Sequence, residues 1–180
     1  IYRKENLKKL KIGPWTNEPD TIEWIFKNSL CAIIRNSLGS LCGYAGVFPG
    51  HPGFGKNYDS VDYKAHGGLT FADSKIGSGK DHHLNNETEV WYFGFDCAHS
   101  GDLTPFSLSF RSMKLEVFSP SDFETYRDIG YVLSETEQLA SQLMLEKCDC
   151  GHTYEVHPFG VCSHNCKCTD LQNTREILEI

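Results

Sequence analysis

The sequence lacks any long uninterrupted run of apolar residues. None of its segments approaches the roughly 18–20 consecutive apolar positions that a helix needs to span a bilayer. It also lacks a positively charged start followed by an apolar stretch, the pattern of a secretory signal peptide. We therefore expect a soluble, cytoplasmic protein without a membrane partner.

Positive charge is scarce as well. The chain carries 17 Lys and Arg against 24 Asp and Glu, a formal net charge of −7. A protein that binds duplex nucleic acid without sequence preference needs an excess of positive charge to approach the phosphates. A basic run within residues 3–11 is short and terminal. We therefore do not expect nucleic acid as a partner.

The eight cysteines are unevenly distributed along the 180 residues. Cys31, Cys42 and Cys97 stand singly in apolar surroundings, where a free cysteine behaves as a small buried hydrophobe. The other five lie within residues 148–168, interleaved with histidines. This distribution favours a reducing compartment and a metal site over a secreted disulfide framework.

The cysteine-rich end is typical of a zinc module, and zinc is the cofactor that we predict. Its candidate metal ligands are Cys148, Cys150, His157, Cys162, Cys166 and Cys168. A segment too short to form its own core can be stabilised by a tetrahedral zinc ion with four such ligands. We favour one zinc held by Cys150, His157, Cys162 and either Cys166 or Cys168. Two zinc ions, or partial disulfide pairing, are the alternatives.

The body of the chain is dominated by short β-prone runs. Residues 22–26, 30–35 and 41–47 are separated by turn residues and predict a hairpin or three-stranded meander. Residues 61–71 alternate in a strand-compatible pattern, and residues 89–96 form the most apolar β-prone run. We therefore place 89–96 as a central strand.

A helix is predicted after these strands. The segment Ser134-Glu135-Thr136-Glu137 matches a capping box, and the helix that it opens ends near Lys147. Its expected apolar face consists of Leu139, Ala140, Leu143 and Met144. The predicted fold class is α+β: a mixed, mainly antiparallel sheet with a long C-terminal helix, followed by a small zinc-binding module. The domains are a body over 1–146 and a zinc knuckle over 147–180.

Two stretches, Asp62–Gly68 and Asp96–Asp102, place titratable groups at strand ends beside glycines, where a backbone can approach a ligand closely. With His51 from the intervening loop, they are expected to face one pocket. The candidates for catalysis are His66, Asp96, His99 and Asp102. The candidates for ligand binding are His51, Asp62, Gly67, Gly68 and Tyr44.

These imidazoles and carboxylates could bind a metal or perform general acid–base chemistry. His66 or Asp96 would be the general base, and His99 the acid or a metal ligand. The structural alternative is that the aspartates cap backbone amides and that His99 is a satisfied polar group. A further alternative makes Cys97 a nucleophile, which requires a thiol of lowered pKa.

Four strings carry a resemblance to a known group of proteins. They are Gly13-Pro14-Trp15 with residues 17–20, residues 41–47 with 49–52, residues 66–71, and residues 91–102. Over roughly residues 13–146, the body resembles a group of small uncharacterised proteins encoded by bacteriophages and prophages. The resemblance implies a viral or bacterial origin and the bacterial host cytoplasm, and it brings no established activity. The tail is similar to short Cys-Gly-His knuckles of bacterial proteins, which implies an addition that the core activity does not need.

The leading functional hypothesis is a pocket that binds, sequesters or hydrolyses a polar, nucleotide-like small molecule. By analogy with other small phage proteins, this would interfere with host signalling or defence. The alternative is a protein–protein interaction module, in which the aromatic-rich loop 48–58 and the zinc knuckle dock a bacterial host protein. A metal-dependent hydrolase is the third hypothesis. The sequence does not decide whether the protein is an enzyme.

Overall fold

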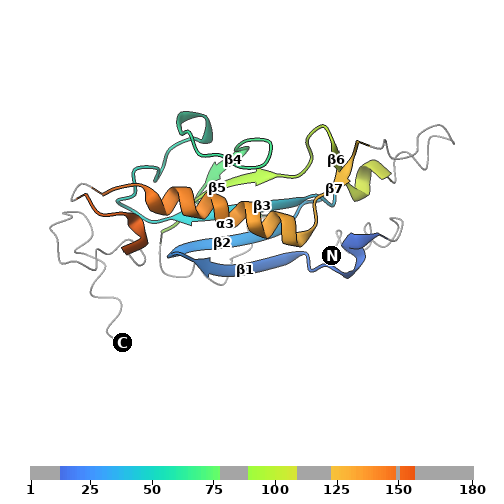
Figure 1. Ribbon diagram of the computed structural model, residues 1–180, viewed down its shortest axis with the longest axis horizontal. Coiled ribbons are helices and arrows are strands. Elements are labelled where there is room, and N and C mark those ends of the chain that lie inside the picture. Colours follow the sequence, from blue (N-terminus) through green and yellow to red (C-terminus); the bar gives the residue numbers. More distant parts are fainter. Residues whose placement is uncertain (1–12, 78–88, 109–122, 149–150, 157–180) are drawn as a thin grey trace.

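The computed structural model describes residues 13–77, 89–108, 123–148 and 151–156, which form an antiparallel sheet with one long helix on it (Figure 1). The main sheet has the strand order β1-β2-β3-β5-β4, and every neighbouring pair is antiparallel. Its strands are β1 (Thr21–Phe26), β2 (Ser29–Arg35), β3 (Leu41–Val47), β4 (Phe71–Asp73) and β5 (Trp91–Asp96). A separate parallel pair consists of β6 (Asp102–Leu103) and β7 (Thr125–Tyr126). The predicted α+β class, mainly antiparallel with a C-terminal helix, is confirmed.

The first three strands form a meander, as the three β-prone runs predict. Between β1 and β2, Lys27 and Asn28 have φ angles of 48° and 65°. Positive φ at both positions is typical of a type I′ turn, whose twist matches that of the strands. Lys27 also forms an ion pair of 2.8 Å with Glu155, and the Asn28 amide donates to the Glu155 carbonyl. The hairpin is therefore tied to the C-terminal end of the described chain.

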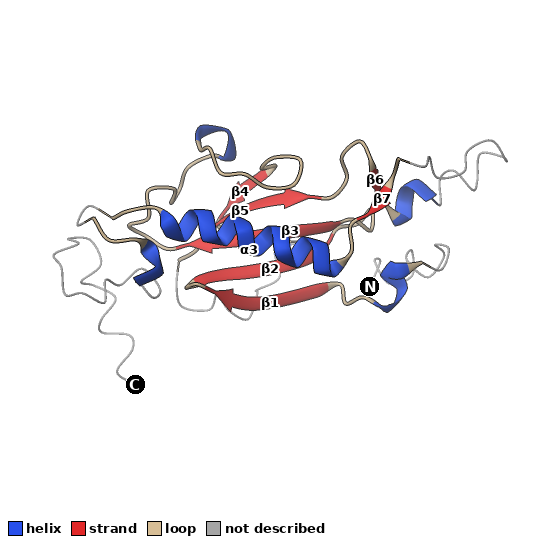
Figure 2. Cartoon of the chain, viewed as in Figure 1, coloured by secondary structure: helices blue, strands red, loops and turns tan. Residues whose placement is uncertain are grey.

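Helix α3 (Ile129–Leu145) lies across one face of the sheet, over β2 and β3 (Figure 2). Its buried side chains repeat at helical spacing: Val132, Thr136, Leu139, Ala140, Leu143 and Met144. Gly43 on β3 permits this close approach, because a Cβ there would lie 2.3 Å from the Thr136 hydroxyl oxygen. Within the described part of the chain, no helix is long and apolar enough to cross a bilayer.

The predicted start of this helix is wrong. The helix begins at Ile129, five residues before the capping-box residue Ser134. The Asp128 carboxylate accepts a hydrogen bond from Tyr131 N at 2.8 Å and so caps the earlier start. The earlier start adds more than a turn, and it brings Tyr131 into the first turn of α3.

The strand predicted over residues 61–71 is also largely wrong. Only Phe71–Asp73 pair as β4, while the residues before them form a loop that includes no strand. Their alternating pattern has a different cause, because the apolar members pack on the core from the loop. These partly buried residues are Val61, Tyr63, Ala65 and Leu69.

A buried ion network holds the start of α3 to the sheet. Arg35 on β2 has a side chain that is 1% exposed and pairs with Glu18 at 2.8 Å and with Asp20 at 3.1 Å. It also donates to the Tyr126 hydroxyl on β7 at 3.0 Å. Glu18, which follows the 3₁₀ turn η1 (Pro14–Asn17), accepts from Ile129 N at 3.2 Å. The network therefore fixes both β7 and the first residue of the helix.

The sheet has a hydrophobic cluster on each face. Because β2 and β3 are buried along their whole length, their alternate residues serve the two clusters in turn. Cys31 and Cys97 belong to the cluster on the helix side, and Cys42 to the other. All three are buried cysteines outside any disulfide, which confirms the interpretation of these cysteines as small hydrophobes.

The segment after α3 packs in the helix-side cluster. Cys148 is 8% exposed and Tyr154, in the 3₁₀ turn η4 (Tyr154–Val156), is 4% exposed. The Tyr154 ring packs on His51 with centroids 4.6 Å apart, and its hydroxyl donates to the Gly50 carbonyl. Two residues of the predicted 147–180 module, Cys148 and Tyr154, thus lie in the core of the body. Of the candidate zinc ligands in the tail, those after Cys148 lie outside the described residues, so the tail zinc stays a prediction.

Candidate metal centre

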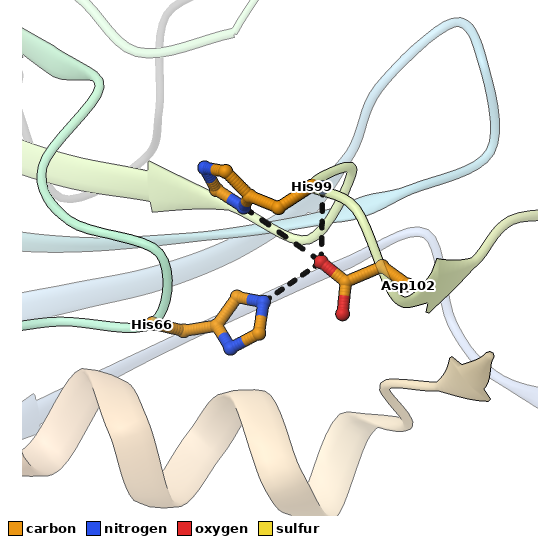
Figure 3. A group of neighbouring side chains, drawn as sticks. All are labelled: His66, His99 and Asp102. Carbon is orange, nitrogen blue, oxygen red and sulfur yellow. Dashed lines mark hydrogen bonds and ion pairs between the residues drawn. The ribbon is translucent and has the colours of Figure 1, made fainter. Parts of the chain in front are cut away.

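Three side chains that the sequence analysis selected, His66, His99 and Asp102, meet beside the first turn of α3 (Figure 3). One ring nitrogen of each histidine and one carboxylate oxygen all lie within 4.8 Å of one another. The two imidazole rings have centroids 5.5 Å apart and an interplanar angle of 72°. Two imidazoles and a carboxylate are a ligand set for zinc and other divalent transition metals. This group could therefore hold a metal ion.

His66 lies at the centre of a β-turn that is anchored to α3. Gly68 N donates to the Ala65 carbonyl at 3.0 Å and closes the turn. Directly before it, the Lys64 backbone exchanges two hydrogen bonds of 2.7 Å with the Gln142 side chain on the helix. These bonds fix the turn along α3.

His99 and Asp102 belong to a second turn, which follows β5. Asp102 N donates to the His99 carbonyl at 2.9 Å, and Asp102 Oδ2 accepts from His99 N at 3.0 Å. Thr125 N then donates to the Gly101 carbonyl at 2.9 Å, next to the β6–β7 pair. Asp102 thus closes its own turn through its side chain, as aspartates often do.

Gly67 allows the two turns to come together. Its φ of 65° is in the left-handed region, and a Cβ at this position would lie 2.3–2.6 Å from three atoms of the His99 ring. Only glycine meets both requirements without strain. The glycine that follows the first histidine therefore provides the space for the second.

Asp102 is the buried centre of the group. Its side chain is 1% exposed, Oδ2 accepts from His66 Nε2 at 2.8 Å, and Oδ1 accepts from Arg127 Nε at 2.9 Å. Burial alone would raise the pKa of Asp102, but the hydrogen bonds from His66, Arg127 and the neighbouring amide outweigh burial and lower it. The carboxylate is therefore ionised at neutral pH.

His66 bridges Asp102 and Tyr131. An ionised carboxylate only accepts, so His66 Nε2 carries the proton in its bond to Asp102. In the neutral ring, Nδ1 then accepts from the Tyr131 hydroxyl at 2.9 Å. Burial raises the pKa of Tyr131, which keeps this hydroxyl protonated. A metal ion at Nε2 would replace the proton there, and the ring would donate from Nδ1 to the Tyr131 oxygen instead.

His99 Nδ1 is buried and has no hydrogen-bond partner among the described residues. It lies 3.7 Å from Asp102 Oδ2, which is too far for a hydrogen bond, although the side chain as a whole is 32% exposed. Buried polar atoms are nearly always paired, and an unpaired one can mark the place of a bound ion. The unpaired nitrogen and the carboxylate oxygen beside it fit a divalent transition-metal ion.

Two side chains that the sequence analysis missed border the group, Arg127 and Tyr131. Arg127 follows β7, and its guanidinium carbon lies 4.8 Å from the centroid of the Tyr131 ring. Tyr131 was missed because the helix was predicted to begin after it. The available signal was Asp128, a favoured N-cap residue three positions earlier.

His51, expected in the same pocket, lies at the other end of α3. Its Nε2 donates to the Leu143 carbonyl at 2.9 Å, and its Nδ1 accepts from Gly53 N at 2.9 Å. Leu143 is 12 residues beyond Tyr131, about 18 Å along a helix at ~1.5 Å per residue. Burial lowers the pKa of His51, so the neutral ring has both nitrogens satisfied. The structure gives His51 a role in the fold and does not bring it to the group.

Asp62 and Tyr44, both ligand-binding candidates, also lie outside the group. Asp62 is exposed and forms an ion pair with Lys64. Tyr44 belongs to the cluster on the face of the sheet away from α3, where its ring meets Phe71 edge-on. The two side chains therefore face different surroundings from His66.

Asp96 caps the end of β5. Its Oδ1 accepts from Ala98 N at 3.1 Å and its Oδ2 accepts from the Thr70 hydroxyl at 3.0 Å. This is the backbone-capping alternative that the sequence left open for the aspartates. The carboxylate is half-buried and is not one of the three clustered ligands.

Burial argues against a nucleophilic Cys97, and it limits which aromatic side chains of loop 48–58 a partner protein could contact. Cys97 is 3% exposed, and burial raises the pKa of its thiol, which opposes a nucleophilic thiolate. In the aromatic loop, Phe48 is buried and Phe54 packs near Trp91 with centroids 6.3 Å apart. Tyr58, in the 3₁₀ turn η2 (Tyr58–Ser60), is exposed and is left to contact a partner protein.

Comparisons with known proteins give no relative from which a function could be transferred. No family model matches the sequence, and neither a curated protein nor a solved structure matches it. The function therefore has to be inferred from the geometry and chemistry of the His66, His99 and Asp102 group.

Proposed function

We propose that this protein binds a divalent metal ion, zinc foremost, through His66, His99 and Asp102, and that the ion acts on a polar small molecule. The observation that carries the proposal is the buried, unpaired Nδ1 of His99 beside the carboxylate oxygen that binds His66. Among the described residues, three side chains can serve as ligands, which leaves at least one coordination position open, as in catalytic zinc sites, whereas structural sites are closed by four.

The ligand types favour a transition metal over a hard cation. Magnesium and calcium prefer oxygen ligands, whereas two of the three ligands here are imidazole nitrogens. Two histidines and one carboxylate also suit iron(II), whose reactions are redox reactions. Zinc ranks first because it needs no redox partner and accepts this mixture of nitrogen and oxygen ligands.

The surrounding residues match what a catalytic ion requires. Tyr131 bonds the second nitrogen of His66 and so orients its ring, and Arg127 holds the second oxygen of Asp102. A bound ion of this class lowers the pKa of a coordinated water to about 7 and supplies a nucleophile for hydrolysis. We therefore place the hydrolysis of a polar, nucleotide-like molecule ahead of simple sequestration. The resemblance to phage proteins supports a host signalling or defence molecule by analogy.

The competing explanation is purely structural. Asp102 would close its turn, His66 would satisfy Asp102, and no ion would bind. Under that explanation, the unpaired Nδ1 of His99 brings a desolvation cost of about 1–3 kcal/mol and no benefit. The two explanations differ in whether His99 contributes to metal affinity.

Cobalt titration of the full chain tests the proposal. Cobalt bound by tail thiolates gives strong charge-transfer absorption, whereas a centre of nitrogen and oxygen ligands gives only weaker visible bands. The wild-type protein should bind one more cobalt ion than His99→Asn, and the difference should lie in the visible bands alone. Asp62→Asn, which changes an exposed carboxylate outside the group, should match the wild type. Equal stoichiometry and affinity in wild type and His99→Asn would refute the proposal.

A further inference from the structure

In the part of the chain that the structure describes, one edge of the Arg127 guanidinium has no hydrogen-bond partner, and this edge lies next to the proposed metal centre. Its Nε donates to Asp102 Oδ1 at 2.9 Å, and its guanidinium lies over the Tyr131 ring. Its side chain is 28% exposed, and among the described residues its terminal nitrogens have no hydrogen bond. The guanidinium is therefore held in place on one edge and over one face, and no described residue bonds to its outer edge.

The position of this edge relative to the metal ligands is set by a single carboxylate. Oδ1 of Asp102 binds Arg127, and Oδ2 faces His66 and His99. An ion at Oδ2 and the guanidinium at Oδ1 therefore lie on either side of the same carboxylate group. The two terminal N–H groups of an arginine match two oxygens of a phosphate in a bidentate arrangement.

The charges of the centre select the same kind of ligand. Arg127 and the Asp102 carboxylate form an ion pair whose charges offset each other, and histidines bind metal ions as neutral rings. A divalent ion therefore leaves the centre with a local charge of about +2. A phosphate monoester carries roughly −1.5 to −2 at neutral pH, whereas a carboxylate carries only about −1. The protein as a whole is acidic, with a net charge of −7, so any such attraction is local to this centre.

We propose that the substrate of this centre carries a phosphate monoester group, with one oxygen on the metal ion and two on the terminal nitrogens of Arg127. The inference rests on the metal centre proposed above and names the substrate class of that centre. A tetrahedral oxyanion can contact the ion and the guanidinium together, which is how metal ions and arginines act jointly on phosphoryl groups. Arg127 is thus a substrate-binding residue as well as the partner of Asp102.

The test uses the full chain loaded with cobalt and titrated with inorganic phosphate, with acetate as the comparison anion. In the wild type, phosphate should change the visible cobalt bands at a concentration at least tenfold lower than acetate. Arg127→Lys keeps the positive charge but lacks the paired terminal N–H groups, and Arg127→Gln removes both the charge and this pair. Each should weaken phosphate binding at least tenfold, whereas Lys27→Gln, which removes a positive charge at the far hairpin, should not.

The outcomes separate this inference from the metal centre. If wild-type protein binds cobalt in the visible-band site but prefers acetate or shows no preference, the phosphate inference is overturned and the metal centre stands. Unchanged phosphate affinity in both Arg127 variants overturns it as well. If the Arg127 variants lose cobalt along with phosphate, the wild-type protein alone tests the inference: a preference for phosphate over acetate supports it, and no such preference overturns it. If the wild type binds no cobalt at this site, the proposed function itself has failed.

Discussion

Replacing Gly67 by alanine should damage the metal centre far more than the fold. A Cβ at position 67 would lie 2.3–2.6 Å from the Nδ1, Cε1 and Nε2 atoms of His99, so this ring must move by about an ångström to reach ordinary contact. The φ of 65° adds strain of about 1–2 kcal/mol for a residue with a side chain. His99 Nδ1 is thereby displaced from Asp102.

Gly68→Ala is a matched control for the strain of placing a side chain on a left-handed backbone. Gly68 also has a positive φ, of 94°, but beyond its chain neighbours no atom of the described residues lies within 4 Å of a Cβ placed there. Both variants should lose a similar ~1–2 kcal/mol from the left-handed backbone, a fall of roughly 2–8 °C in Tm for a chain of this size. Only Gly67→Ala should also weaken metal binding, by about 10–100-fold, the range seen when a ligand loses its orientation.

The assay combines thermal unfolding with zinc competition against a chromophoric chelator, on the full chain in both variants. Gly67→Ala should match Gly68→Ala in Tm to within a few degrees and fall below it in zinc affinity. If the two variants bind zinc equally well, the contact between Gly67 and His99 does not shape the centre, and the reasoning fails.

Three further predictions concern the fold. Arg35→Met should lower the unfolding free energy by about 3–5 kcal/mol in urea denaturation, because Glu18 and Asp20 lose a buried partner; a loss under about 1 kcal/mol would show that the network is not needed. Burial holds the pKa of His51 below its ordinary 6.5, so as the pH falls below about 6.5 the unfolded chain gains a proton that the folded chain resists. The stability advantage of wild type over His51→Gln should therefore shrink between about pH 7 and pH 5, and a constant difference would contradict this. A chain ending at residue 156 should keep the Tm of the full chain if the tail is an addition. A chain ending at residue 146 lacks the buried Tyr154 and should lose about 3–5 kcal/mol of unfolding free energy. Equal stability of the two truncated chains would contradict this.

The sheet was predictable because its signals are local. The meander strands are short runs of β-prone residues separated by turns, and β5 is the most apolar run in the chain. The helix start was not, because Asp128 and Ser134 are both competent caps and only the packing of the preceding turn decides between them. The loop before β4 showed strand-like alternation because its apolar side chains reach the core without joining the ladder.

The candidate site was predictable in part for a related reason. Two stretches rich in titratable residues identified His66, His99 and Asp102, since strand ends beside glycines often form sites. Their grouping depends on contacts 36 residues apart between His66 and Asp102, and 65 residues apart between His66 and Tyr131. No periodic pattern encodes such contacts. The placement of His51 against the C-terminal end of α3 is set by tertiary packing in the same way.

Anomalous diffraction at the zinc edge, from crystals of the full chain grown with zinc, would show whether His66, His99 and Asp102 hold a zinc ion. The proposed function predicts an anomalous peak bounded by His66 Nε2, His99 Nδ1 and Asp102 Oδ2, at about 2.0–2.2 Å from each. The Tyr131 hydroxyl should remain bonded to the opposite nitrogen of His66. A map without density at this position, with His66 Nε2 still bonded to Asp102, would contradict it.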